Sequence, residues 1–165
     1  MEGVARISGS GSVFRVFLPL STEAVPRRVP EKSLDGQGMA TGGIILVVDD
    51  QEMIRNMAKT MLGKFGFEVL TSEDGLEALE IFRRNPAGVR LVLTDLSMPR
   101  MNGWETLAGL REIRPDIPVI LASGYDEARV MEGRHAERPE AFLGKPYLMA
   151  DLKAALNKAL GFVSP

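Results

Sequence analysis

The residues best suited to chemistry in this 165-residue chain are carboxylates, a serine and a lysine that each follow an apolar run. Asp49 and Asp50 end "IILVVDD", Asp95 ends "RLVLTD", Ser123 ends "IPVILAS", and Lys145 follows "AFLG". Two adjacent carboxylates at the end of a buried strand repel each other and resist desolvation. A cation held between them and a third carboxylate would offset this repulsion. A hydroxyl and an ammonium could then bind the oxygens of a phosphoryl group.

The kind of metal follows from the side chains that the chain offers. It has no cysteine and a single histidine, so thiolate sites, disulfides and cysteine nucleophiles are excluded and there is little room for histidine chemistry. Carboxylate oxygens suit Mg²⁺, which retains several waters and takes one or two carboxylates. If the strands that end at Asp50 and Asp95 are neighbours, the sequence predicts a Mg²⁺ site in the crevice between them.

The apolar runs from Ile44 onward alternate with helical patterns. Three of the runs are almost wholly apolar, which is typical of parallel strands covered on both faces. Right-handed crossovers between them predict an α/β fold with a doubly wound parallel sheet of five strands, whose working crevice lies at the carboxyl ends of the strands. Strands are expected at 44–48, 67–72, 90–94, 117–123 and 141–143, and helices at 53–65, 76–82, 104–113 and 148–159, with a weaker helix at 126–138.

The bulk composition narrows the classes of function. Hydrophobic residues make up 45% of the chain and charged residues 25%, the balance of a globular protein. The net charge of −2 gives no reason to expect nucleic acid as a partner. No apolar run approaches the ~20 residues of a membrane span, and the N-terminus lacks the pattern of a signal peptide. Together with the lack of cysteine, this favours a cytoplasmic protein without membrane contact by this chain.

Three zones of the chain differ in composition. Residues 1–20 end in the strand-like "SVFRVFLPL", which the turn-rich "SGSGS" precedes. Residues 21–43 carry prolines, glycines and scattered charges without periodicity, which indicates a linker. Residues 44–161 hold the whole alternation of strands and helices and form the expected domain.

Residues 44–160 resemble the receiver domain of two-component response regulators nearly from end to end. The resemblance is carried by the acid pair in "LVVDDQ", by "TDLSMPRMNG", by "ASGY" and by "KP", in this order and each at a predicted strand end. It implies the flavodoxin-like (βα)5 fold with strand order 2-1-3-4-5. It also implies a phosphoacceptor that takes its phosphoryl group from a histidine kinase or a histidine phosphotransfer protein, and that catalyses only its own phosphorylation and dephosphorylation.

The same resemblance assigns the acceptor and the metal ligands. Asp95 is the implied phosphoryl acceptor, a carboxylate nucleophile that forms an acyl phosphate. Asp50 and Asp95 would bind Mg²⁺ directly, with the backbone carbonyl of Ser97 as a third protein ligand. Asp49 would act mainly through metal-bound water.

Further implied roles concern the phosphoryl oxygens and the response to them. Ser123 would bond one phosphoryl oxygen and Lys145 would pair with another. The Lys145–Pro146 peptide bond would be cis and direct the lysine into the crevice. Phe142, three residues before the lysine, matches the switch aromatic of the family, and Ser123 is expected to move with it.

Each of these residues also has an ordinary structural interpretation. Asp50 could cap the helix that follows it, and Asp95 could open a turn. Ser123 could be a helix cap or a turn residue. Lys145 is by default a solvated surface lysine, and Phe142 is by default core. The co-occurrence of the motifs at successive strand ends favours the functional interpretation for the acids and the lysine.

The N-terminal zone resembles a second signalling domain. Its "SGSGSVFRVFLPL" is similar to the last strands of the ATP-binding domain of histidine kinases, although Ser12 stands where threonine is usual; the matching residues are Gly9, Gly11, Phe14, Leu18 and Pro19. This implies a hybrid histidine kinase as the parent, and an arbitrary hydrophobic tail is the alternative. His135, in "RHAERPE", lacks the acidic residue that follows a phosphoaccepting histidine, so the phosphodonor is expected from elsewhere.

Two functions stay open at this point. The first is a Mg²⁺-dependent phosphoacceptor that switches the surface formed by residues 126–138, the strand 141–143 and the last helix; a weak homodimer is compatible with it. The second is a receiver-like docking module in which phosphorylation plays no part. A flavodoxin-like cofactor binder is disfavoured, because it needs a phosphate-binding loop where Asp49 and Asp50 repel phosphate.

Overall fold

The computed structural model describes residues 42–124 and 137–161. The expectations for residues 1–41 and most of the weak helix at 126–138 lie outside these ranges, as does His135. The described elements alternate along the chain as the sequence predicts, and each boundary lies within two residues of the expected one. They are β1 (Ile44–Val48), α1 (Glu52–Lys64), β2 (Glu68–Ser72), α2 (Gly75–Arg84), β3 (Val89–Asp95), α3 (Gly103–Ile113), β4 (Val119–Ser123), β5 (Ala141–Gly144) and α5 (Met149–Leu160).

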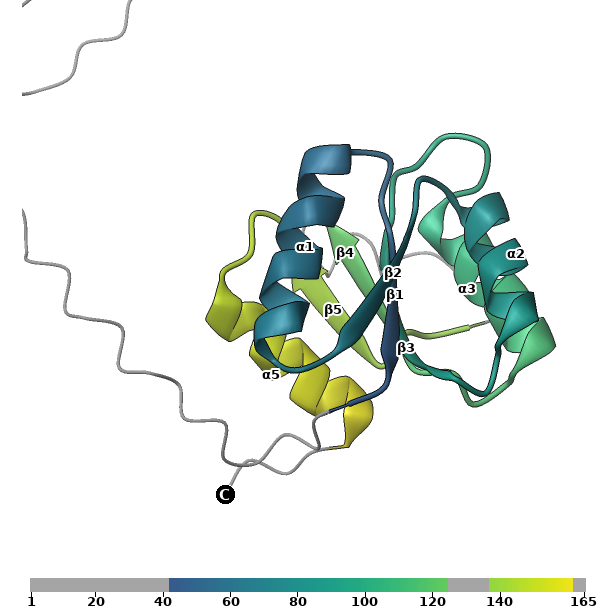
Figure 1. Ribbon diagram of the computed structural model, residues 1–165. Coiled ribbons are helices and arrows are strands. Elements are labelled where there is room, and N and C mark those ends of the chain that lie inside the picture. The colour runs from purple at the N-terminus through teal and green to yellow at the C-terminus, as the bar shows by residue number, and fades with distance from the viewer. Residues whose placement is uncertain (1–41, 125–136, 162–165) are drawn as a thin grey trace, which may run out of the picture. The chain divides into compact units, whose positions relative to one another are not determined.

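The five strands form one parallel sheet in the order β2-β1-β3-β4-β5 (Figure 1). This is the order that the sequence analysis expects. The register pairs Val48 of β1 with Thr94 of β3. The residues that follow these two positions, Asp49 and Asp95, therefore leave the sheet side by side at its carboxyl edge.

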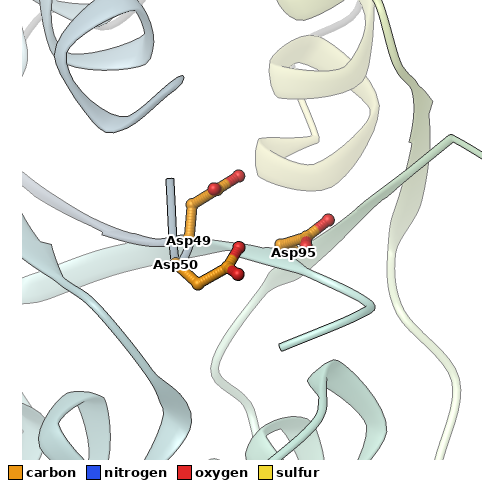
Figure 2. Close-up of side chains that lie close together, drawn as sticks. All are labelled: Asp49, Asp50 and Asp95. Carbon is orange, nitrogen blue, oxygen red and sulfur yellow. The ribbon is translucent and has the colours of Figure 1, made fainter. Parts of the chain in front are cut away.

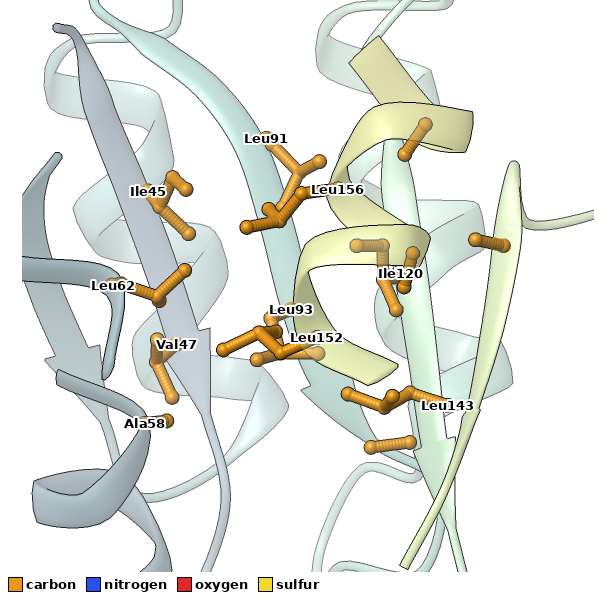
Figure 3. Packing of buried hydrophobic residues seen from close by; sticks show 14 of the residues in the cluster. Ile45, Val47, Ala58, Leu62, Leu91, Leu93, Ile120, Leu143, Leu152 and Leu156 are labelled. Atoms are coloured by element: carbon orange, nitrogen blue, oxygen red, sulfur yellow. The ribbon is translucent and has the colours of Figure 1, made fainter. Parts of the chain in front are cut away.

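Helices cover both faces of this sheet, with α1 and α5 on one face and α2 and α3 on the other (Figure 1). Ile45 and Val47 of β1 pack in the cluster under α1 and α5, whereas Leu46 and Val48 pack in the cluster under α2 and α3. Successive side chains of a strand point to opposite faces, so two covered faces require an unbroken apolar run. Figure 3 shows the first cluster, in which Leu156 of α5 lies against the sheet.

The helix ends follow local capping rules. α3 begins with a capping box in which the Asn102 side chain accepts from the backbone of Glu105, and the Glu105 side chain accepts from the backbone of Asn102. α5 ends at Leu160, and the next residue, Gly161, takes the left-handed conformation (φ +70°) typical of a helix C-cap. Within the described residues, no helix has the length and apolar character that crossing a membrane requires.

Candidate functional site

Three carboxylates lie together at the carboxyl ends of β1 and β3. Asp49 directly follows β1 and is 3% exposed, Asp95 is the last residue of β3 and is 6% exposed, and Asp50 is exposed. One oxygen from each carboxylate lies within 4.8 Å of an oxygen from each of the other two (Figure 2). The predicted convergence of the three acids is therefore present in the structure.

Lys145 joins the two buried carboxylates. Its Nζ lies 2.6 Å from Asp49 Oδ2 and 2.8 Å from Asp95 Oδ1. The lysine is placed by the short segment after β5, where its backbone N–H donates to the carbonyl of Ser123 at 2.7 Å, and the peptide bond between Lys145 and Pro146 is cis. One ammonium among three carboxylates leaves an excess of negative charge in the crevice.

The pKa values of the ionisable groups follow from burial and from this ion pairing. Burial raises the pKa of Asp95, and the hydrogen bond and charge of Lys145 offset that rise only in part. Burial alone would lower the pKa of Lys145, but its hydrogen bonds to Asp49 and Asp95 and the negative charges of these groups together outweigh burial, so the net change is a rise. Burial likewise raises the pKa of Tyr147, which follows the lysine by two residues. Lys145 therefore stays protonated, whereas the ionisation of Asp95 is less favourable in the folded chain than in water.

Every polar group of Asp49 has a partner. Its Oδ1 accepts from the backbone N–H of Gln51 at 2.9 Å, and its carbonyl accepts from Arg55 Nη1 at 2.6 Å. Its own N–H donates to the carbonyl of Ser72 at 3.2 Å, and its Oδ2 takes the Lys145 ammonium. Sequence reasoning missed both the Lys145 and the Arg55 contacts. The Arg55 contact had a usable signal, because a basic residue early in a helix can reach back to the chain that enters it.

Asp50 is placed differently from its neighbour. Gln51 is the N-cap residue of α1, so Asp50 does not cap this helix. Its exposed carboxylate makes no hydrogen bond or ion pair with the described residues and lies with the other two acids. An all-oxygen donor set with excess negative charge and one open carboxylate fits a hard divalent cation.

Ser97 and Ser123 lie near the acidic cluster in the chain or in the sheet, whereas Phe142 lies within β5. Ser123 is the last residue of β4, is 2% exposed, and comes directly after Ala122, the register partner of Asp95. Ser97 is exposed, two residues after Asp95. Phe142 is half-buried in the edge strand β5 and pairs with Leu121 of β4.

Comparison with known proteins gives one family. The model of the response regulator receiver domain matches residues 45–157. The sensor kinase CckA of Brucella abortus (strain 2308) is 32% identical over 161 residues, which cover 92% of this chain and 17% of the kinase. The response regulator MprA of Mycobacterium sp. (strain KMS) is 30% identical over 121 residues, 73% of this chain and 52% of that protein. This chain thus spans about half or less of the length of these curated relatives.

Solved structures give the same family. The receiver domain from Clostridium thermocellum superposes with a TM-score of 0.66 at 33% identity, over 72% of this chain and 94% of that one. The receiver domain from the hybrid histidine kinase CckA superposes with a TM-score of 0.60 at 31% identity, over 72% of this chain and 99% of that one.

Proposed function

Because this chain belongs to the response regulator receiver domain family, as a phosphoacceptor signalling domain of two-component systems, we propose that it takes a phosphoryl group onto Asp95. The observation that carries the assignment is the environment of this side chain. Asp95 is buried, lies 2.8 Å from the Lys145 ammonium, and shares the crevice with Asp49 and Asp50. Asp49 shares these three features, and what distinguishes Asp95 is its position at the end of β3 in "TDLSMP", the segment that resembles the acceptor segment of receiver domains.

The proposed reaction is a displacement at phosphorus. An Asp95 Oδ forms the new P–O bond while the bond from phosphorus to the donor nitrogen of a phosphohistidine breaks, and that nitrogen leaves with the electron pair. A carboxylate and an incoming phosphoryl group repel each other, so catalysis depends on positioning and on balancing charge. The Lys145 ammonium supplies part of this balance, and the Ser123 hydroxyl would donate to a phosphoryl oxygen. Burial limits the access of water to the aspartyl group.

The proposed cofactor is Mg²⁺. Asp50, Asp95 and the carbonyl of Ser97 would hold it, and Asp49 would contact it through a bound water. Bound Mg²⁺ would supply the positive charge that the carboxylates and the phosphoryl oxygens need. The oxygen donor set and the open carboxylate of Asp50 support this choice of metal.

The proposed partner is the phosphohistidine of a histidine kinase or of a histidine phosphotransfer protein. We further propose a hybrid histidine kinase as the parent protein, with residues 1–20 as the end of its ATP-binding domain, 21–43 as a linker and 44–161 as the receiver. The match to CckA supports this, because it covers 92% of the chain, or about 152 residues. Only 124 residues lie from position 42 to the end, so the match extends into residues 1–41.

The proposed consequence of phosphorylation is a change at β5 and α5; residues 126–138, which the sequence analysis expects to change with them, lie mostly outside the described residues. Ser123 would move toward the new phosphoryl oxygens, and Phe142 would respond to its displacement. The cytoplasmic location expected from the sequence is part of this proposal. Nothing in the described residues gives specific support to a docking module that ignores phosphorylation, since the acceptor, the acids and the lysine are all in place.

The proposal is tested by intact-mass measurement after incubation with Mg²⁺ and acetyl phosphate. The wild-type chain is expected to gain one phosphoryl group, and Asp95→Asn to gain none. Asp116→Asn is the matched control, because Asp116 is 88% exposed and away from the crevice, and it should gain the group like the wild type. An Asp95→Asn chain that is phosphorylated as readily as wild type would refute the assignment. A wild-type chain that gains nothing with any donor would favour the docking module.

A further inference from the structure

The loop that joins Asp95 to α3, residues 96–102, is held in place along its length. At its start, the Leu96 N–H donates to the carbonyl of Ala122 at 2.8 Å. At its end, the Gly103 N–H donates to the carbonyl of Leu96 at 3.0 Å. In the middle, Met98 is 8% exposed and packs in the cluster under α2 and α3. This loop carries Ser97, the proposed backbone ligand of the metal.

One side chain of the loop reaches out to a neighbouring segment. Arg100 Nη2 pairs with Asp74 Oδ2, and it also lies 3.2 Å from Glu73 Oε1. Glu73 is 63% exposed, and an ion pair between two exposed groups contributes little. Asp74, in contrast, is only 1% exposed, so its carboxylate depends on the few groups that touch it.

The two oxygens of Asp74 have separate tasks. Oδ1 accepts from the N–H of Glu77 at 2.9 Å and caps α2. Oδ2 forms an ion pair with the guanidinium of Arg100 and accepts no hydrogen bond from the described residues. A buried carboxylate oxygen without a partner is costly. Without Arg100, the segment that carries Asp74 would therefore shift toward water.

Such a shift would also displace residues 96–102, the acceptor loop, because the two segments touch. A Cβ placed on Gly75, the residue after Asp74, would lie 2.7 Å from Met101 Cγ and 2.1 Å from Thr106 Oγ1. Met101 is a member of the loop, and Thr106 lies in the second turn of α3. The start of α2 is thus packed directly against the loop and the helix that follow the acceptor.

We infer that Arg100 is a positioning residue for phosphoryl acceptance: its ion pair with buried Asp74 fixes the acceptor loop and thereby the backbone of Ser97. This inference rests on the proposed function. Arg100 itself takes the left-handed backbone conformation (φ +66°), which favours glycine. Glycine at this position would therefore accept the same backbone conformation and remove the side chain that pairs with Asp74 and Glu73.

The central experiment compares the wild type with Arg100→Gly. Mg²⁺ affinity is measured by calorimetry and by the fluorescence of Trp104, which lies in the first turn of α3. The phosphorylation rate with acetyl phosphate is measured at limiting and at saturating Mg²⁺. We expect Arg100→Gly to raise the Mg²⁺ dissociation constant about 3- to 10-fold. The rate at limiting Mg²⁺ should fall in proportion, and the rate at saturating Mg²⁺ should stay within about twofold of wild type, because Arg100 acts through the loop.

Three further variants separate the ion pair from a general loss of stability. Arg100→Lys keeps a positive charge and should recover most of the Mg²⁺ affinity. Asp74→Asn keeps the cap of α2 and removes the charge, so it should weaken Mg²⁺ binding like Arg100→Gly, and the double variant should be no worse than either single one. Arg83→Gln removes an exposed arginine of α2 that forms no ion pair with the described residues, and it should bind Mg²⁺ like wild type.

The outcomes that overturn the inference are distinct from those that overturn the proposed function. If the wild type binds Mg²⁺ and is phosphorylated, but Arg100→Gly has an unchanged dissociation constant, only the inference fails. It also fails if Arg100→Lys is no better than Arg100→Gly, or if the effects of Arg100→Gly and Asp74→Asn simply add. If Asp95 of the wild type accepts no phosphoryl group, the proposed function fails, while the Mg²⁺ affinities still test the role of Arg100.

Discussion

At the scale of single residues, the crevice combines groups that oppose one another. Lys145 contacts the carboxylates of both Asp49 and Asp95, and both carboxylates are buried. The ammonium can satisfy them in part, but three carboxylates with one cation remain under repulsion. In the absence of metal, this arrangement favours readiness to bind a cation and a phosphoryl group at the expense of stability.

The free-energy cost of ionising buried Asp95 predicts how the stability of the fold depends on this residue. Burial raises the pKa of Asp95 above its ordinary value of 3.8, so the folded chain binds this proton more tightly than the unfolded chain. The corresponding stability is fully present below the unfolded pKa and is lost as the pH rises through the folded pKa. In metal-free buffer at pH 7, we expect Asp95→Asn to melt a few degrees above wild type, on the order of 2–6 °C.

The pH dependence of that difference provides the check. Thermal melts in EDTA should show the advantage of Asp95→Asn shrinking as the pH falls toward 4, where the wild-type carboxyl becomes protonated. The exposed Asp116→Asn variant should melt like wild type throughout. An Asp95→Asn chain that melts below wild type at pH 7 would show that Lys145 stabilises the ionised carboxylate more than burial opposes it.

At the scale of elements, α3 must begin very close to the strand that carries the acceptor. A Cβ on Gly103, the first residue of α3, would lie 2.5 Å from the carbonyl oxygen of Asp95 and 2.9 Å from Leu96 Cα. Both neighbours are backbone atoms, which cannot rotate away as a side chain can. The absence of a side chain at Gly103 therefore lets the helix approach the acceptor strand.

Alanine substitution at two helical glycines tests this close approach. Gly103→Ala should lower the free energy of unfolding by about 1–3 kcal/mol, because the backbone at Asp95 must move, and it should slow phosphorylation by acetyl phosphate. Gly63→Ala is the matched control: it lies in α1 with nothing within 4 Å of the added Cβ, and it should raise the free energy of unfolding by roughly 0.5–1 kcal/mol. Urea titrations measure both values, and a Gly103→Ala chain as stable and as readily phosphorylated as wild type would contradict the prediction.

The strands and most of the acidic site could be predicted because they rest on local patterns. Residues such as Ile45 and Leu46 belong to an unbroken apolar run, which indicates a strand covered on both faces. Parallel strands end at the same edge of a sheet, so Asp50, Asp95 and Lys145 were expected at one edge. The strand order that makes β1 and β3 neighbours, and so brings Asp50 and Asp95 together, was implied only by the resemblance to receiver domains.

The contacts between loops could not be predicted in the same way. Arg100 and Asp74 are 26 residues apart and belong to segments with no periodic pattern, so only the packing of α2 against α3 brings them together. An arginine after a proline in a loop is by default a solvated side chain. Lys145 contacts both Asp49 and Asp95, and its contact with Asp49 depends on side-chain conformations that no sequence pattern encodes.

At the scale of the whole molecule, the metal site is assembled by the topology of the sheet. Asp50 follows β1, and Asp95 ends β3, 45 positions later along the chain. The crossover through α1, β2 and α2 separates them in sequence, whereas the pairing of β1 with β3 brings them together. An unfolded chain offers no such arrangement, so a cation bound there stabilises only the folded state.

The proposed Mg²⁺ site thus predicts a change in global stability. At a free Mg²⁺ concentration about 100 times the dissociation constant, linkage stabilises the fold by about 2.7 kcal/mol, which corresponds to a rise in melting temperature on the order of 10 °C. Asp50→Ala should abolish this rise, because it removes the one open carboxylate of the cluster. In EDTA the same variant should melt like wild type or slightly above it, since Asp50 is exposed and only repels its neighbours. Differential scanning calorimetry of both proteins with and without Mg²⁺ measures these melting temperatures. An unchanged rise in Asp50→Ala would show that Asp50 is not a ligand of the metal.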